Sequence, residues 1–135
     1  MKFVIYDAPP LSNFINLPVL QKASDNYKLW QNCQANFPKF LKYSLGQKID
    51  ITLIDVIELI LTAGFAAKNN KLAIIQKASI KLDAVKFFLQ IAWELKAVDN
   101  KKFAAVSVPL VEIGKMLGGW QKQLIKETPP NIGGG

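Results

Sequence analysis

Hydrophobic residues recur at alternating steps of three and four near the end of the chain: Phe103, Val106, Leu110, Ile113, Leu117, Trp120 and Leu124. This spacing is typical of a helix that packs lengthwise against other helices. At about 100° per residue, Lys115, Lys122 and Lys126 fall within roughly 40° of one another on the opposite side. The segment from about 101 to 126 is therefore predicted to be a helix with one hydrophobic face and one basic face.

Three further segments carry a helical pattern, over about 17–37, 43–68 and 70–97. The last of these has a regular hydrophobic seam: Ile75, Ala78, Leu82, Val85, Leu89 and Ala92. A strand between 49 and 61 is possible on propensity, but the length of the segment and the spacing of Asp55 and Glu58 favour a helix. Short connections between long helices give antiparallel neighbours. The expected fold is therefore all-α, an up-down-up-down four-helix bundle.

The predicted helix over 43–68 is hydrophobic nearly all round, with only a narrow polar strip. A helix of this kind in a four-helix domain contacts more than its own core. We therefore expect a subunit interface that includes Ile51, Ile54 and Phe65, through which the bundle self-associates as a homo-oligomer.

The last predicted helix contains glycines and a proline that need a physical reason. Each glycine in a helix costs about 1 kcal/mol relative to alanine. Close approach by another helix or by a partner chain would explain Gly114 and Gly118, which we assign to the same interface, while phosphate contact by the exposed backbone is a minor alternative. Proline removes a backbone donor. Either the helix kinks at Pro109, or it begins near Ser107 with Pro109 in its first turn.

The two ends of the chain differ from the rest. Residues 1–16 have no helical period and are predicted to form an extended arm, and residues 128–135 are rich in proline and glycine and are predicted to be disordered. The bundle is expected to occupy residues 17–127. Because the sequence shows neither a signal peptide nor a confident membrane span, we expect a soluble, cytoplasmic protein with no membrane partner.

The net charge of +7 comes from 17 cationic and 10 acidic residues, and every cation is lysine. Lysine binds phosphate as a point charge, without the bidentate fork of arginine. Nucleic-acid binding, RNA or DNA, should therefore be salt-dependent and weakly sequence-specific. The alternative is that the charge only maintains solubility. The candidate groups are the lysines of the last helix named above, the group around the first connection, Lys39, Lys42 and Lys48, and the pair Lys68 and Lys71 at the second connection.

The composition excludes most catalytic chemistry. The chain has no histidine and one cysteine, Cys33, which we expect to be buried and unreactive. Serine–histidine and cysteine–histidine catalysis, an internal disulfide and cysteine-based zinc sites are therefore impossible. The carboxylates of Asp55 and Glu58 fit surface salt bridges better than acid–base catalysis. We expect no catalytic residue, no cofactor and no metal.

Four blocks of the sequence carry a family resemblance: LPVLQK at 17–22, FPK at 37–39 with LG at 45–46, KFFL at 86–89 with AWELK at 92–96, and EIGKMLGGW at 112–120. They resemble the four-helix-bundle accessory variability determinant (Avd) proteins of diversity-generating retroelements. The last block is the most specific. The same broad superfamily holds proteins encoded by intervening sequences in bacterial large-subunit ribosomal RNA genes.

The resemblance implies a non-catalytic accessory protein that forms a homopentameric ring. It implies binding to a reverse transcriptase and to the retroelement RNA, in support of mutagenic cDNA synthesis. By position, Lys86 and Lys115 match basic residues of the family, as do the lysines around the first connection, whereas Gln90 replaces a second basic residue. The alternative is a self-assembling structural protein of the ribosomal intervening-sequence type.

Overall fold

The computed structural model describes residues 16–127. The predictions for the arm before residue 16 and for the tail at 128–135 lie outside the described residues. The elements are helical throughout: α1 (Pro18–Gln34), α2 (Lys39–Leu41), the π-helical turn η2 (Lys42–Gly46), α3 (Gln47–Phe65), α4 (Lys68–Glu94) and α5 (Asn100–Glu127). No strand occurs between residues 16 and 127, so the all-α prediction and the helical interpretation of 49–61 are confirmed.

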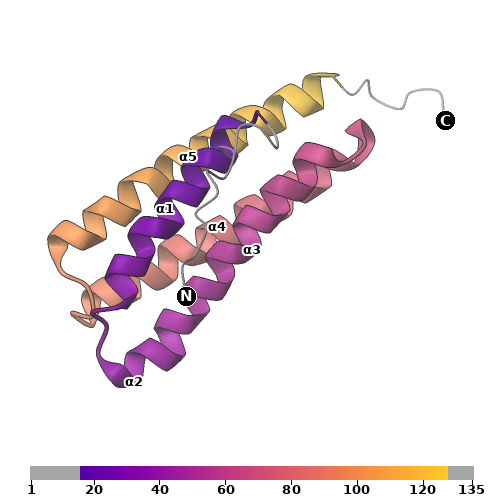
Figure 1. Cartoon of the computed structure of the whole chain (residues 1–135). Coiled ribbons are helices and arrows are strands. Elements are labelled where there is room, and N and C mark those ends of the chain that lie inside the picture. Colours follow the sequence, from indigo (N-terminus) through magenta and orange to yellow (C-terminus); the bar gives the residue numbers. More distant parts are fainter. Residues whose placement is uncertain (1–15, 128–135) are drawn as a thin grey trace, which may run out of the picture.

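The four long helices run antiparallel in the order up, down, up, down (Figure 1). Helix α1 packs against α3 and α5, and α4 packs against the same two helices from the other side. The α1–α2 connection and the α4–α5 connection therefore lie at one end of the bundle, and the α3–α4 turn lies at the other. The predicted bundle is confirmed, while its cyclic assembly stays a prediction.

The core follows the predicted seams closely. All six residues of the α4 seam are buried, and the α5 seam is buried except for Phe103 and Trp120, which pack partly exposed against the core. The largest side chain of the core is the fully buried Trp30 of α1, which meets Phe37 edge-on with ring centroids 5.4 Å apart. Hydrophobic burial along these seams is the main stabilising contribution to the bundle.

Two polar side chains are buried with the core, and they differ in how they are satisfied. The hydroxyl of Thr52 donates to the carbonyl oxygen of Lys48 at 2.6 Å, one turn earlier in α3. Asn26 of α1 is 1% exposed, and neither of its amide atoms has a hydrogen-bond partner in the described part of the chain. A buried amide without a partner destabilises a fold.

The start of the second long helix differs from the prediction. The helix predicted from residue 43 begins at Gln47, because residues 42–46 form the π-helical turn η2. Gly46 is buried there, and a β-carbon on it would lie 3.2 Å from Cδ2 of Phe37. The ring of Phe37 thus occupies the space that a side chain at position 46 would need.

Helix α5 begins well before its proline. The carboxylate of Asp99 accepts a hydrogen bond from the backbone N–H of Lys102 at 2.8 Å, which is the geometry of an N-terminal cap. Pro109 lies inside the helix that follows. The alternative in which the helix starts near Ser107 is therefore wrong.

Helix α4 is terminated by a residue with left-handed backbone conformation, Lys96. Lys96 has φ 61°. The N–H of Ala97 donates to the carbonyl oxygen of Ala92 at 2.9 Å, and the N–H of Lys96 donates to the carbonyl oxygen of Trp93 at 3.0 Å. This pair of bonds is a Schellman motif, in which glycine is the usual residue at the left-handed position.

None of the helices between residues 16 and 127 combines the length and hydrophobicity that crossing a membrane requires.

Candidate nucleic-acid interface

The outer face of α5 carries Lys115, Lys122 and Lys126, which we call the α5 stripe, and all three side chains are exposed. The two carboxylates of the same helix are occupied by other helices. Glu112 forms an ion pair with Lys22 of α1, and Glu127 forms one with Lys68 of α4 at 3.5 Å. The α5 stripe forms no ion pair with a carboxylate anywhere in residues 16–127. Its positive charge is therefore not neutralised within the described chain.

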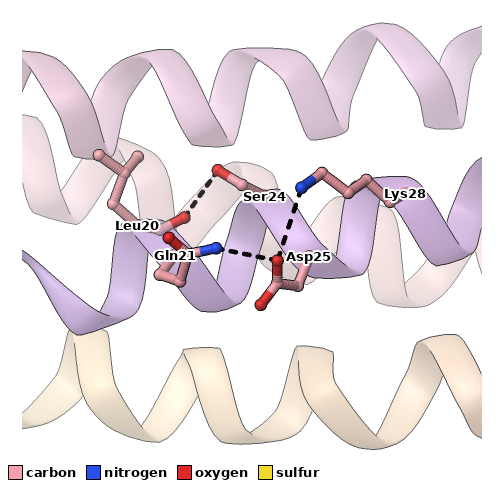
Figure 2. A network of polar contacts seen from close by, with 5 residues as sticks. All are labelled: Leu20, Gln21, Ser24, Asp25 and Lys28. Atoms are coloured by element: carbon pink, nitrogen blue, oxygen red, sulfur yellow. Dashed lines mark hydrogen bonds and ion pairs between the residues drawn. The ribbon is translucent and has the colours of Figure 1, made fainter. Parts of the chain in front are cut away.

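The surface of α1 shows the opposite arrangement (Figure 2). The carboxylate of Asp25 accepts a hydrogen bond from Gln21 at 2.9 Å and lies 3.8 Å from the ammonium of Lys28. Nearby, the hydroxyl of Ser24 donates to the carbonyl oxygen of Leu20 at 2.8 Å. Lys22, the other lysine of α1, pairs with α5 as described. Both lysines of α1 thus face a carboxylate, and this surface is a poorer anion site than the α5 stripe.

Lys86 of the neighbouring helix α4 lies against Gly114 of α5. Its ammonium lies across α4 and α5, so that a β-carbon on Gly114 would be 3.1 Å from Nζ. Its one carboxylate partner among residues 16–127 is Asp83 at 3.5 Å, on the same face of α4. The structure therefore places Lys86 against the residue that precedes Lys115 in the chain, and these are the two lysines that the family resemblance singled out.

The other predicted lysines lie elsewhere. The group Lys39, Lys42 and Lys48 sits in α2, η2 and the first turn of α3, at the end of the bundle away from the C-terminal half of α5. Lys39 and Lys48 are exposed and Lys42 is half-buried. The structure does not join this group to the α5 stripe within one chain.

Sequence reasoning missed two further exposed lysines at that end, Lys96 and Lys101 in the α4–α5 connection. The two carboxylates nearby in the chain are engaged, since Asp99 caps α5 and Glu94 accepts a hydrogen bond from Gln90. Asp50, in the first turn of α3, accepts hydrogen bonds from Trp30 and Gln31. These lysines could have been predicted from the expected topology, because the first and third connections of an up-down bundle lie at the same end.

The pair at the second connection has a structural role. The ammonium of Lys71 donates to the carbonyl oxygens of Ala63 at 2.7 Å and Gly64 at 3.1 Å. These are carbonyls of the last turn of α3, where the regular helical bonds run out. The carbonyl oxygen of Ala63 also accepts the N–H of Ala66 at 3.3 Å. Lys68 is occupied by Glu127. We therefore do not count either lysine in the interface.

The residues assigned to a subunit interface fall into two groups. Ile51, Ile54 and Phe65 are exposed on α3 by 47%, 43% and 68%. At Gly114 the close neighbour is α4 of the same chain, whereas at Gly118 no described atom lies within 4 Å of the position that a β-carbon would take. Contact of these residues with a second copy stays a prediction.

Two ionisable groups outside the lysines, the carboxylate of Asp55 and the thiol of Cys33, were weighed above as candidates for chemistry. Asp55 pairs with Lys81 of α4 at 2.9 Å, as the salt-bridge interpretation predicts, whereas none of the ion pairs within residues 16–127 involves Glu58. Cys33 is 2% exposed, and burial raises the pKa of its thiol, as expected for a buried and unreactive cysteine. Residues 16–127 contain no group of three histidine, cysteine or carboxylate side chains placed to hold a metal ion.

Comparison with protein families gives a match that spans the bundle. The family described as bAvd-like matches residues 18–124, from the first residue of α1 almost to the end of α5. None of the curated proteins compared with the chain matches it. The family match confirms the resemblance to Avd proteins, while the relation to ribosomal intervening-sequence proteins stays a prediction. The chain therefore belongs to the bAvd-like family.

Proposed function

We propose that the chain is a non-catalytic accessory protein of a diversity-generating retroelement, which binds the reverse transcriptase and its RNA or cDNA to support mutagenic cDNA synthesis. Membership of the bAvd-like family supports an Avd-type accessory role. The observation that carries the nucleic-acid part is the α5 stripe. Its three lysines share one exposed face, while the carboxylates of the same helix are held by Lys22 and Lys68.

The mechanism is electrostatic. The stripe runs for about 16 Å along the helix axis, so its lysines can contact several phosphates of one strand. Each contact releases condensed counterions, which makes the affinity fall steeply with salt. Lysine ammonium groups hold a phosphate backbone without reading bases.

Self-association multiplies this effect. We assign the exposed Ile51, Ile54 and Phe65 of α3 to contacts between copies of the chain in a pentameric ring. A ring repeats the α5 stripe and the lysine group of α2, η2 and α3 around its axis, so the potential seen by a nucleic acid is larger than that of one bundle. The reverse transcriptase docks on the remaining hydrophobic or mixed surface.

Two matched double variants test the nucleic-acid interface. Lys115→Gln with Lys122→Gln removes two stripe lysines, and Lys22→Gln with Lys28→Gln removes the same charge from α1. We expect the first pair to weaken binding of a fluorescent single-stranded RNA, and to lower the salt slope by about 0.7 for each lost contact. The control pair should retain most of the affinity. Equal losses in both pairs would reduce the effect to net charge, and unchanged binding in the first pair would place the site elsewhere.

Assembly and partner binding are tested by solution mass. Light scattering of the full chain should give a pentamer, and addition of a structured RNA or of the reverse transcriptase should give a larger species. A monomer that is indifferent to both would contradict the proposal and leave only the four-helix bundle.

A further inference from the structure

A short helical segment at one end of the bundle exposes two aromatic rings. Phe40 of α2 is the most exposed large hydrophobic side chain of residues 16–127, at 78%, and Tyr43 of η2 follows three residues later at 69%. The other large hydrophobic residues of the segment, Leu41 and Leu45, pack against the core. Because these two leucines face inward, the rings lie on the outer side, where they gain little from burial.

The two rings are also free of other rings. None of the ring-to-ring contacts within residues 16–127 involves Phe40 or Tyr43, whereas the nearby Phe37 meets Trp30 edge-on in the core. An exposed aromatic face can stack on a nucleic-acid base, and it does so with little preference among sequences, because every base has a π-face.

Each ring directly follows a lysine, Lys39 before Phe40 and Lys42 before Tyr43. Neither lysine takes part in an ion pair within residues 16–127, and the sequence has no acidic residue over 26–49. Surfaces that bind proteins are enriched in aromatic residues but depleted in lysine. Lysines without carboxylates beside exposed rings therefore favour a nucleic-acid strand over a protein as the occupant of this segment.

We propose that Phe40 and Tyr43 are base-stacking residues: their rings receive unpaired bases of a single nucleic-acid strand, while Lys39 and Lys42 hold the phosphates beside them. We call these four residues the stacking segment. This inference rests on the proposed function and adds to it a binding mode that lysine alone does not supply. The bases of a duplex are already paired and stacked, so the stacking segment selects single strands.

The first test compares two strands of equal charge. One is a fluorescent single-stranded oligodeoxynucleotide, and the other is an abasic strand of the same length, which keeps the phosphates and lacks the bases. The full chain should bind the first strand more tightly by about five-fold or more, which is the lower end of the effect of one stacked base. Electrostatic contact alone would give equal affinities, because counterion release depends on the phosphates.

A ring variant then locates the preference. Phe40→Leu with Tyr43→Leu removes both rings and keeps two hydrophobic side chains and every lysine. Its affinity for the base-bearing strand should fall to that for the abasic strand, while its affinities for the abasic strand and for a duplex stay unchanged. Because both rings are exposed, the thermal midpoint should stay close to that of wild type.

Phe87→Leu is the matched control for Phe40→Leu. Phe87 of α4 is 64% exposed and also follows a lysine, but that lysine, Lys86, pairs with Asp83 at 3.5 Å. The control should keep the preference for the base-bearing strand, and Phe40→Leu alone should reduce it. Equal effects of the two changes would overturn the assignment of the stacking segment.

The outcomes distinguish this inference from the proposed function. Equal affinities of wild type for the two single strands would overturn base stacking and leave the electrostatic proposal standing, and this comparison needs no variant to fold. An unchanged preference in the ring variant, together with weaker binding of the reverse transcriptase, would assign the rings to a protein interface instead. Absence of binding to either strand would overturn the proposed function itself.

Discussion

The indole nitrogen of Trp30 donates a hydrogen bond to Oδ1 of Asp50 at 3.1 Å and so joins α1 to the first turn of α3. The same oxygen accepts a second hydrogen bond, from Gln31 at 3.0 Å. A carboxylate in the first turn of a helix is also stabilised by the helix dipole. Because the Trp30 side chain is fully buried, Asp50 satisfies a donor that no water reaches.

Replacing Asp50 should therefore destabilise the bundle. Asp50→Ala leaves the buried indole N–H without an acceptor, and we expect the free energy of unfolding to fall by about 1–3 kcal/mol. Urea denaturation followed by circular dichroism measures the change. Asp25→Ala, which removes an exposed carboxylate of α1, should stay within about 0.5 kcal/mol of wild type. Equal changes in the two variants would mean that the hydrogen bond to Trp30 contributes nothing.

The left-handed residue at the end of α4 offers a stabilising change. Lys96 has φ 61°, a conformation that costs about 1–2 kcal/mol for a residue with a β-carbon and little for glycine. Lys96→Gly should relieve this strain and raise the free energy of unfolding by about 0.5–1 kcal/mol. The gain is smaller than the strain, because glycine also has more conformational freedom in the unfolded chain. Gln90→Gly, inside the same helix, should lower it by about 1 kcal/mol. Loss of stability in both variants would contradict the left-handed geometry at Lys96.

Asn26 is the clearest place where the core is polar without compensation. Neither amide atom has a partner among residues 16–127, and a buried polar group without a hydrogen bond costs about 1–3 kcal/mol. Asn26→Leu, which has a similar size, should therefore raise the midpoint of urea denaturation. Asn36→Leu serves as the control, because Asn36 is exposed and donates to the carbonyl oxygen of Asn32 at 3.0 Å. A marked loss of stability in Asn26→Leu would show that the amide does have a partner.

The sequence predicted the long helices well because their seams are regular. In α4 the hydrophobic positions repeat without interruption, and each of them is buried. The prediction was weakest where the chain changes direction. The π-helical turn before α3 has no hydrophobic period of its own, and it depends on the ring of Phe37 packing against Gly46. Contacts between residues of separate elements decide such a turn, and a single-sequence pattern does not contain them.

The candidate site was predicted in part, for a similar reason. Helical spacing placed Lys115, Lys122 and Lys126 on one face, because it depends on one helix alone. The pairing of Glu112 with Lys22 depends on which helix lies beside α5, so the sequence could not show that the stripe lacks carboxylate partners. The seating of Lys86 over Gly114 depends in the same way on the register between α4 and α5.

The buried thiol of Cys33 gives a prediction about both reactivity and pH. The side chain is 2% exposed, its thiol lies 3.7 Å from the carbonyl oxygen of Lys102, and burial raises the pKa above the ordinary value of 9.0. A thiol reagent should label Cys33 only when the bundle opens, so adding urea below the transition should speed labelling in step with the unfolded population.

The pH dependence follows from the direction of the same shift. Because the pKa of Cys33 is higher in the folded chain than in the unfolded chain, the protonated thiol contributes stability below pH 9. That contribution is lost as the pH rises from the ordinary value through the raised one. Wild type should therefore lose stability relative to Cys33→Ala when urea denaturation is compared at about pH 8 and pH 10. A constant difference between the two proteins at both pH values, or rapid labelling of the folded chain, would place the thiol in contact with water.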